Sequence, residues 1–218
     1  TIASTASPIY VENIEVNLIH QYLDWINLMT YDFHGPWGGE TNAVTNFNSP
    51  LYAISDDPSP DPVNTTFNLN AAVQLFIQLG VPHEKINAGL AFYGRSFAGV
   101  PDENNGLLVS YTGVPGIGTW ENGVLDYWDL KDNYINLNGY DAYWHFEAKV
   151  PWLYNPITQI MISYDDEESI REKASYIIEQ DIGGAMFWEF SGDKFSDLIN
   201  QVNDIFNSES SNGIIGDL

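Results

Sequence analysis

The sequence contains no cysteine, which excludes disulfides, thiolate metal sites and cysteine nucleophiles. Basic residues are also scarce, because 7 Lys and Arg stand against 30 Asp and Glu and the formal net charge is -23. A chain with this charge is repelled by phosphate backbones and anionic lipid surfaces. No hydrophobic run is long enough to span a bilayer. We therefore expect neither nucleic acid nor a membrane as a partner.

The first ten residues, "TIASTASPIY", contain neither an initiator Met nor the basic stretch that opens a signal peptide. We expect an internal start, produced by processing, cloning or truncation. The sequence pI of about 4.1 and the lack of cysteine together favour a secreted, extracellular protein.

Hydrophobic residues make up 44% of the chain and aromatic residues 14%, which is enough for a substantial core. Apolar runs with the composition of strands lie at residues 2–7, 25–30, 86–94 and 183–190. Helical spacing is found at residues 69–79, 168–179 and 195–206. Strands that alternate with helices are typical of a parallel sheet covered by helices, so we predict an α/β protein.

The stretch from residue 97 to residue 160 has a different texture. Short aromatic runs alternate with Gly and Asn, as in "GTWENGVLDYWDL", which is typical of antiparallel hairpins. We predict that this stretch forms an inserted α+β domain. Beyond it, Asp165 and Glu168 have the spacing of an acidic capping box at the start of the next helix.

Polar and aromatic side chains stand at the C-terminal ends of three predicted strands. The three ends read Tyr31-Asp32-Phe33-His34, Tyr93-Gly94-Arg95 and Trp188-Glu189. In a parallel α/β barrel the catalytic groups are placed at this end of the strands. We therefore expect these side chains to meet at one site.

The three strand motifs resemble a known family. "MTYDFHGPW", "GLAFYGRSF" and "GGAMFWEFSGD" are similar to consecutive strand motifs of glycoside hydrolase family 18, the chitinases. The stretch "PWLYNP…ISYDDEESIREKASYI" resembles the return of that family's insertion domain to the barrel. The resemblance implies the C-terminal half of a TIM (β/α)8 barrel, with strands five to eight. The implied parts are barrel strands five to seven at 1–96, the chitinase insertion domain at 97–160, the last helices and eighth strand at 161–207, and a polar tail at 208–218.

The resemblance also implies a mechanism, in which the substrate's own N-acetyl carbonyl oxygen is the nucleophile. Such an attack requires a hydroxyl donor and a carboxylate close to the acetamide. Tyr31 is expected to donate to the acetamide oxygen, Asp32 to contact the same group, and Met29 to line the pocket floor. A structural alternative remains for Asp32, whose carboxylate could cap a helix or pair with Arg95.

The remaining site residues implied by the resemblance bind sugar. Trp188 is expected to form the apolar floor beneath the sugar at the cleavage point, with an ordinary core Trp as the alternative. Trp37 is expected to stack on the product side, and Tyr93 and Arg95 to form the cleft wall. His34 is expected to be a loop-packing residue.

One feature of the family is missing from the chain. The family's acid ends a D-x-x-D-x-D-x-E run, and no such run occurs in the 218 residues. Glu189 is not expected to replace it, because strand alternation turns it away from Trp188 and toward the outer helices. The four His are spread along the chain, so no metal cluster is expected. The reaction implied by the resemblance needs no organic cofactor.

These expectations combine into one functional prediction with two alternatives. The intact protein is predicted to hydrolyse β-1,4 linkages in chitin or chitooligosaccharides, with retention and through an oxazolinium intermediate. The missing N-terminal barrel half, in the same precursor or a second chain, is the expected partner, and this chain alone is expected to be inactive. The alternatives are a non-catalytic, lectin-like chitin-binding module and an endo-N-acetylglucosaminidase.

Overall fold

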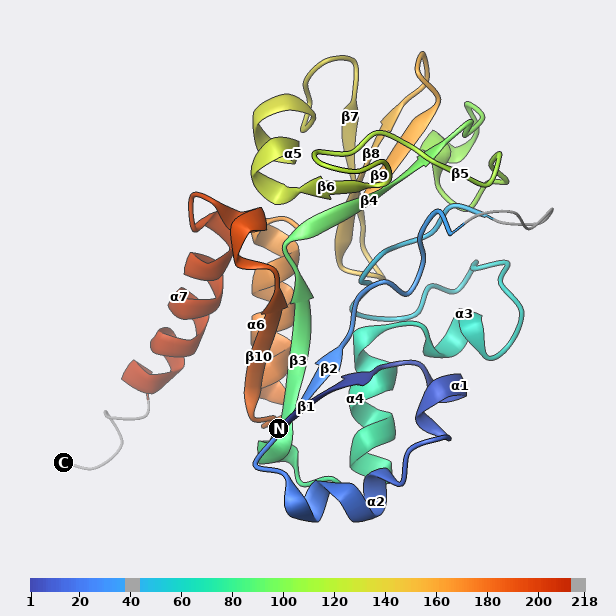
Figure 1. The fold of residues 1–218 in the computed structure, drawn as a ribbon. Helices are drawn as coiled ribbons and strands as arrows, with labels where there is room; N and C mark the ends of the chain where they lie inside the picture. The colour runs from blue at the N-terminus through green and yellow to red at the C-terminus, as the bar shows by residue number, and fades with distance from the viewer. Residues whose placement is uncertain (38–43, 213–218) are drawn as a thin grey trace.

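A computed structural model describes residues 1–37 and 44–212 of the chain (Figure 1). All the predicted strands form within it. Strands β1 (Ile2–Thr5), β2 (Ile26–Met29), β3 (Ile86–Ala91) and β10 (Gly184–Trp188) make a parallel four-stranded sheet in the order β1-β2-β3-β10. The parallel arrangement predicted from the alternation of strands and helices is confirmed.

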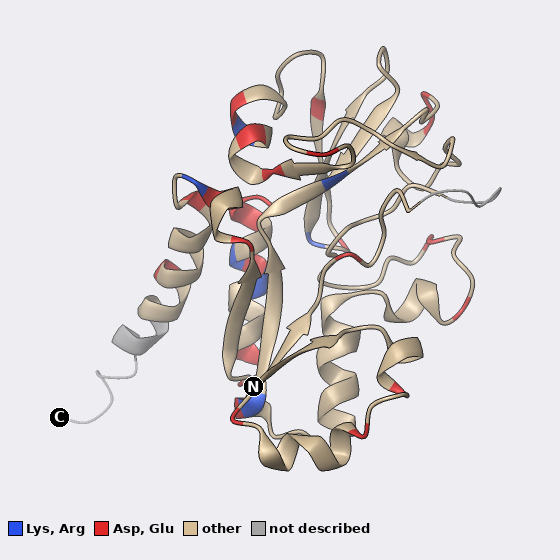
Figure 2. Cartoon of the chain, in the orientation of Figure 1, with Lys and Arg blue, Asp and Glu red and all other residues tan. Residues whose placement is uncertain are grey.

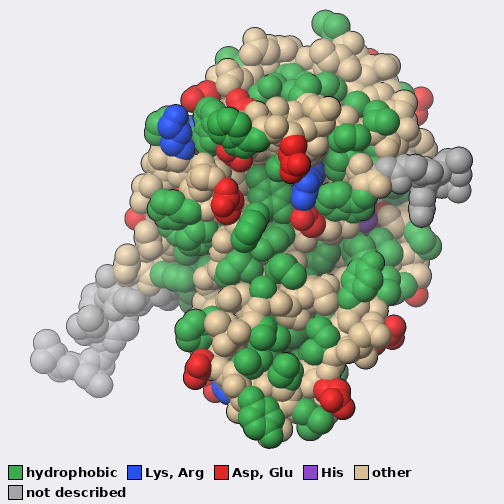
Figure 3. All heavy atoms as spheres, viewed as in Figure 1, with side chains coloured by type: hydrophobic (Ala, Val, Ile, Leu, Met, Phe, Trp, Pro, Cys, Tyr) green, Lys and Arg blue, Asp and Glu red, His purple; other side chains and the backbone are tan. Residues whose placement is uncertain are grey.

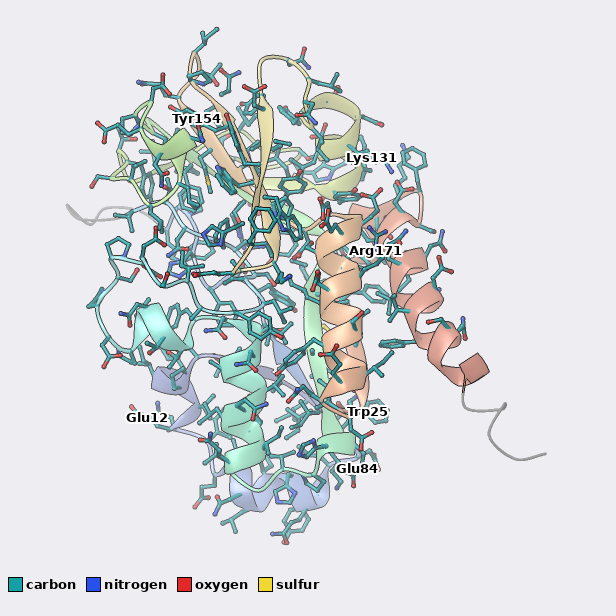
Figure 4. The ribbon with its side chains drawn as sticks, turned by 180° about the vertical axis from the view of Figure 1, so that it is seen from behind. Glu12, Trp25, Glu84, Lys131, Tyr154 and Arg171 are labelled. Atoms are coloured by element: carbon teal, nitrogen blue, oxygen red, sulfur yellow. The ribbon has the colours of Figure 1, made fainter. Side chains whose placement is uncertain are left out.

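The two faces of the parallel sheet differ. Alternate residues such as Ile26, Leu28 and Ile86 are fully buried and pack with apolar side chains of α4 (Leu69–Gln78) and α6 (Glu167–Glu179). Both helices lie behind the sheet in Figure 1 and in front of it in the reverse view of Figure 4. No helix of the described residues covers the opposite face, where the side chains of Met29 and Trp188 are 36% and 59% exposed.

The predicted ends of the helices can be compared with the observed ones. In α4, the side chain of Asn68 accepts a hydrogen bond from the amide of Ala71, and the helix stops before Gly80, whose φ is +87°. The last helix, α7 (Asp197–Asn212), reaches into the predicted polar tail. The rest of that tail, 213–218, lies outside the described residues.

The predicted capping box of α6 is displaced by one residue. Asp166, not Asp165, accepts from the amide of Ser169 at 2.8 Å, and the Ser169 hydroxyl accepts from the amide of Asp166 at 2.9 Å. Asp165 instead forms a buried ion pair with Lys173, which lies eight residues further along the chain, within α6. The spacing of Asp165 and Glu168 pointed to the wrong pair, because Asp165 is engaged by Lys173 and the cap is formed by the next residue.

A second, antiparallel sheet follows β3, as predicted from the hairpin texture. Its main path runs β5-β4-β9-β8-β7, and β6 pairs with β4. Its elements are β4 (Tyr93–Ala98), β5 (Val114–Pro115), β6 (Val124–Asp126), α5 (Tyr127–Asn133), β7 (Asp141–His145), β8 (Val150–Asn155) and β9 (Ile160–Ser163). The sheet therefore begins four residues before the expected boundary of 97 and ends three residues after 160.

Short helices complete the connections. They are α1 (Pro8–Val11), α2 (Val16–Ile19), α3 (Val63–Thr66) and the 3-10 turns η1 (His20–Tyr22), η2 (His83–Lys85), η3 (Asn104–Gly106) and η4 (Phe190–Asp193). No helix in the described part of the chain is long and apolar enough to cross a membrane.

The two sheets share a hydrophobic core and a polar junction. Leu90 of β3 belongs to the same buried cluster as Leu125 of β6 and Leu198 of α7. Lys131 of α5, labelled in Figure 4, forms ion pairs with Glu167 of α6 at 2.8 Å and with Asp197 of α7 at 2.9 Å. Figure 2 shows acidic residues spread around both sheets, so Lys131 is one of few cations that they surround.

Candidate active site

Tyr31 lies two residues after the end of β2, on the open side of the sheet. Thr30 fixes the strand end, because its hydroxyl donates to the Gly89 carbonyl at 2.7 Å and accepts from the Gly89 amide at 2.9 Å. A Cβ on Gly89 would lie 2.9 Å from the Tyr31 ring, so the ring can rest against β3 only because residue 89 is glycine. The Tyr31 hydroxyl contacts the Met186 sulfur at 3.7 Å.

Asp32 turns its carboxylate to the second sheet. It accepts from the Tyr93 hydroxyl at 2.7 Å and from Nε and Nη2 of Arg95, both at 2.8 Å. The alternative that Asp32 pairs with Arg95 is thus confirmed. The pair still faces the cavity, because the Arg95 and Asp32 side chains are 17% and 37% exposed.

The sequence suggested that Tyr93 and Arg95 lie at the end of a parallel strand, but the structure places them elsewhere. They belong to β4, the first strand of the second sheet, and the change of sheet occurs at Phe92. The Phe92 amide donates to the Trp188 carbonyl, whereas the Phe92 carbonyl accepts from Tyr127 of the second sheet's helix. Both predicted cleft-wall residues reach the site from a different sheet than expected.

Arg95 also connects Asp32 with Trp37. The guanidinium carbon of Arg95 lies 4.7 Å from the centre of the Trp37 ring and 5.1 Å from that of Tyr93. Such cation–π contacts stabilise a planar guanidinium over a ring. The exposed Trp37 ring is therefore held beside the ion pair.

The predicted residues surround adjoining cavities. One cavity of about 310 Å³ is lined by Met29, Tyr31, Asp32, Tyr93, Arg95, Glu121, Val124 and Trp188. Trp37 lines a neighbouring cavity that shares Met29, Tyr31 and Asp32 with it. Figure 3 shows hydrophobic side chains gathered over the middle of this face. The structure thus brings all seven predicted residues together at the junction of the two sheets.

Burial sets the protonation of the site. It raises the pKa of Tyr31 to about 12, with help from the Asp32 charge, so the Tyr31 hydroxyl keeps its proton at neutral pH. Burial and Asp32 also raise the pKa of Tyr93. His34 lies half-buried beside Phe67, and the loss of solvent around its ring lowers its pKa to about 4 despite the charge of Asp57. His34 is therefore neutral at neutral pH.

Comparison with known proteins decides the family. The sequence model of glycosyl hydrolases family 18 matches residues 1–193. The chain belongs to family 18. It is 45% identical to Chitinase A1 of Niallia circulans over 203 residues. These residues cover 93% of this chain and 28% of that protein. The chain spans less than half the length of the curated relatives that it matches.

Solved structures agree with the family 18 assignment. A Bacillus thuringiensis chitinase superposes with a TM-score of 0.86 at 40% identity, over 94% of this chain and 35% of that one. A human protein described as a pseudo-chitinase with retained chitooligosaccharide binding superposes with a TM-score of 0.82 at 27% identity, over 94% and 57%.

The side chains of Trp188 and Glu189, at the end of the last strand of this family 18 chain, both face the cavity side. Trp188 is 59% exposed, so it is not an ordinary core Trp. Glu189 does not face the outer helices, because it lines the same cavity as Trp188 and receives a hydrogen bond from Ser191. That expectation was wrong because β10 ends at Trp188 and strand alternation does not extend to the next residue.

Sequence reasoning missed Trp120 and Glu121, which lie between β5 and β6. Both line the cavity of about 370 Å³ that adjoins Trp188, and the exposed Trp120 ring is held by a hydrogen bond from Nε1 to Asp126 at 2.9 Å. The available signal was a Trp beside Gly and Asn in "GTWENG". Within the described residues, no group of three His, Asp or Glu could hold a metal ion.

Proposed function

We propose that this chain is the part of a family 18 chitinase that binds and stabilises the reacting N-acetyl group. The substrate is chitin or chitooligosaccharides, and the reaction is hydrolysis of β-1,4 linkages with retention. The observation that carries the proposal is the placement of the Tyr31 hydroxyl, the Asp32 carboxylate and the exposed Trp188 ring around one cavity. Family 18 membership and the chitinase relatives support the same substrate class.

The proposed mechanism assigns the acetamide to Tyr31 and Asp32. Its carbonyl oxygen attacks the anomeric carbon as the glycosidic bond breaks, and the positive charge spreads over an oxazolinium ring. Tyr31 stays protonated and donates to that oxygen, while Asp32 stabilises the positive charge. Trp188 packs against the C–H face of the sugar, and Met29 lines the floor. Water then opens the ring and restores the original anomeric configuration.

The leaving oxygen needs a proton from an acid that these residues do not supply. We assign it to a D-x-x-D-x-D-x-E glutamate in a preceding half of the barrel, in the same precursor or a second chain. In this arrangement β1, β2, β3 and β10 are barrel strands five to eight, and the second sheet is the chitinase insertion domain. Within the described residues β1 pairs only with β2, and β10 only with β3, which leaves two strand edges for that half. The chain by itself would be inactive.

Three further features belong to the proposal. Met29, Trp37, Tyr93, Arg95 and Trp188 bind the sugar chain, with Trp37 on the product side. No metal or organic cofactor takes part. The protein is secreted, in keeping with its acidic composition and its lack of cysteine.

The competing function is a chitin-binding module without catalysis. The exposed rings of Trp37 and Trp188 favour it, because stacking alone binds sugars, and the human relative is described as such a protein. An endo-N-acetylglucosaminidase would share the mechanism, but the large second sheet beside the cavity favours a linear polymer.

Tyr31→Phe in the complete protein that contains this chain separates these functions. Loss of one hydroxyl donor should lower kcat on chitooligosaccharides by about 100-fold. Affinity, measured by calorimetry, should change by less than about threefold, since stacking is kept. Tyr22→Phe is the matched control, because Tyr22 is exposed and lines none of the three cavities at the junction. A complete wild-type protein that binds chitooligosaccharides without cleaving them would establish the binding module instead.

A further inference from the structure

Asp32 has a backbone conformation that must be held from outside. Its φ is +58°, in the left-handed region that residues with a side chain adopt infrequently. The same residue directs its carboxylate to Tyr93 and Arg95, so a relaxation of the backbone would move the carboxylate away from both.

Asn48 holds this conformation from behind the cavity. Its side-chain oxygen accepts from the amide of Asp32 at 3.0 Å, and its backbone carbonyl accepts from the amide of Phe33, also at 3.0 Å. The backbone amides of the two residues after Tyr31 therefore both donate to Asn48. Asn48 is buried and lines none of the cavities around the site, so it cannot contact the substrate itself.

Asn48 is in turn attached to the sheet that carries Arg95. Its amide donates to the hydroxyl of Ser163 at 2.8 Å, and Ser163 of β9 lies opposite Arg95 of β4 in the antiparallel register. One residue thus connects the backbone of Asp32 with the strand pair that presents the guanidinium. This connection fixes the separation between the two partners of the ion pair.

The next residue secures the other side of Tyr31. The hydroxyl of Ser49 donates to the carbonyl of Thr30 at 2.7 Å. Lys173 donates to the carbonyl of Ser49 at 2.6 Å and to its hydroxyl at 2.9 Å. Residues 48 and 49 therefore hold the chain immediately before and after Tyr31.

The side chain of Asn48 is used as an acceptor alone. Its Nδ2 is buried and has no hydrogen-bond partner within the part of the chain that the structure describes. An idle buried donor destabilises a fold, so an apolar side chain would suit this position better if only packing mattered. The carbonyl oxygen directed at Asp32 is what this side chain contributes.

We propose that Asn48 is a positioning residue that sets the orientation of Asp32 toward the acetamide of the substrate. The assignment rests on the proposed chitinase function, because it concerns the same reaction. Asn48 acts through the Asp32 amide and never touches the substrate.

The first test compares Asn48→Ala with Asn46→Ala in the complete protein. Asn46 is also buried and makes two hydrogen bonds, to Asp57 and from the amide of Phe47, but it contacts neither Tyr31 nor Asp32. Misplacement of Asp32 should lower kcat by about 10- to 100-fold in Asn48→Ala, with KM changed by less than about threefold. Asn46→Ala should leave kcat within about twofold of wild type. Asn48→Asp, which keeps the accepting oxygen, should recover most of the lost kcat.

The second test needs no activity. Amide hydrogen exchange of Asp32 and Phe33 should be at least about tenfold faster in Asn48→Ala and unchanged in Asn46→Ala. Unchanged exchange, or a kcat within twofold of an active wild type, would overturn the positioning role. If the wild type cleaves no chitooligosaccharide, the chitinase proposal fails separately, and the exchange rates still decide whether Asn48 holds Asp32.

Discussion

Two ion pairs are hydrogen-bonded to the neighbouring residues Asn48 and Ser49, and the two pairs differ in exposure. Lys173 and Asp165 meet at 2.6 Å with their side chains 0% and 1% exposed, whereas Arg95 and Asp32 are 17% and 37% exposed. The buried pair is shielded from any ligand, so it stabilises the fold, including the backbone beside Tyr31. The open pair can exchange a hydrogen bond with a substrate at little cost to the fold, because water already screens it. Burial, not charge, separates structural from chemical ion pairs in this chain.

The strongest challenge to this comparison is Lys173→Met. It leaves the Asp165 carboxylate buried without a counter-charge, so the free energy of unfolding should fall by about 3–5 kcal/mol in chemical denaturation. Lys149→Met is the matched control, because Lys149 and Glu172 form a pair that is 34% and 39% exposed. The control should change the free energy of unfolding by less than ~1 kcal/mol. Equal losses in the two variants would mean that burial does not separate them.

His34 extends the comparison to a half-buried group that stays neutral. Its pKa is about 4 in the folded protein and 6.5 ordinarily, so the unfolded chain takes up the proton first as the pH falls. Stability from this group is complete above pH 6.5 and is lost as the pH falls toward 4. Between pH 7 and 4.5, the wild type should therefore lose roughly 2 kcal/mol of unfolding free energy that His34→Gln does not lose.

Asp166 changes the stability with pH in the opposite direction to His34. Its contribution must therefore be separated from that of His34. Burial raises its pKa from 3.8 to about 6, so the folded state binds this proton more tightly and stability decreases as the pH rises through that window. Only the difference between wild type and His34→Gln, from denaturation at both pH values, isolates the histidine. The same pH dependence in both proteins would show that His34 is protonated in the folded state.

The smallest effect on stability is expected for Arg95→Gln. Loss of this partly exposed pair should change the free energy of unfolding by less than ~1 kcal/mol. Turnover of chitooligosaccharides by the complete protein should nevertheless fall by about tenfold or more, because Asp32 loses two donors that orient it. Denaturation and initial rates on the same samples measure both. A stability loss as large as that of Lys173→Met would place Arg95 with the buried pair.

Much of the site could be predicted because its signals are local. Tyr31, Asp32 and Trp188 stand where an apolar strand ends in side chains that are unusual for a core, and the structure places them at such ends. The sheet of Tyr93 and Arg95 was predicted incorrectly, since the apolar run continues through Phe92 without a break in composition. A change of sheet inside such a run depends on pairing partners that are distant in the sequence.

Other features could not be predicted because they depend on distant contacts. Asn48 becomes informative only when its oxygen is seen on the amide of Asp32 and its amide on Ser163, far along the chain. The capping rule pointed to Asp165 with Glu168, whereas the cap uses Asp166 with Ser169, and Asp165 pairs with Lys173 from the next turns of the helix. Trp120 looked like any hairpin aromatic until the two sheets were placed together.

The position of β10 has a consequence for synthesis on the ribosome. Its partner in the parallel sheet is β3, and the whole antiparallel sheet lies between them in the sequence. Trp188 therefore cannot join Tyr31 and Asp32 until the intervening sheet has emerged, and closing so long a loop slows folding. Until then the nascent chain carries β3 with one edge open, a state in which chaperone binding would protect it from aggregation.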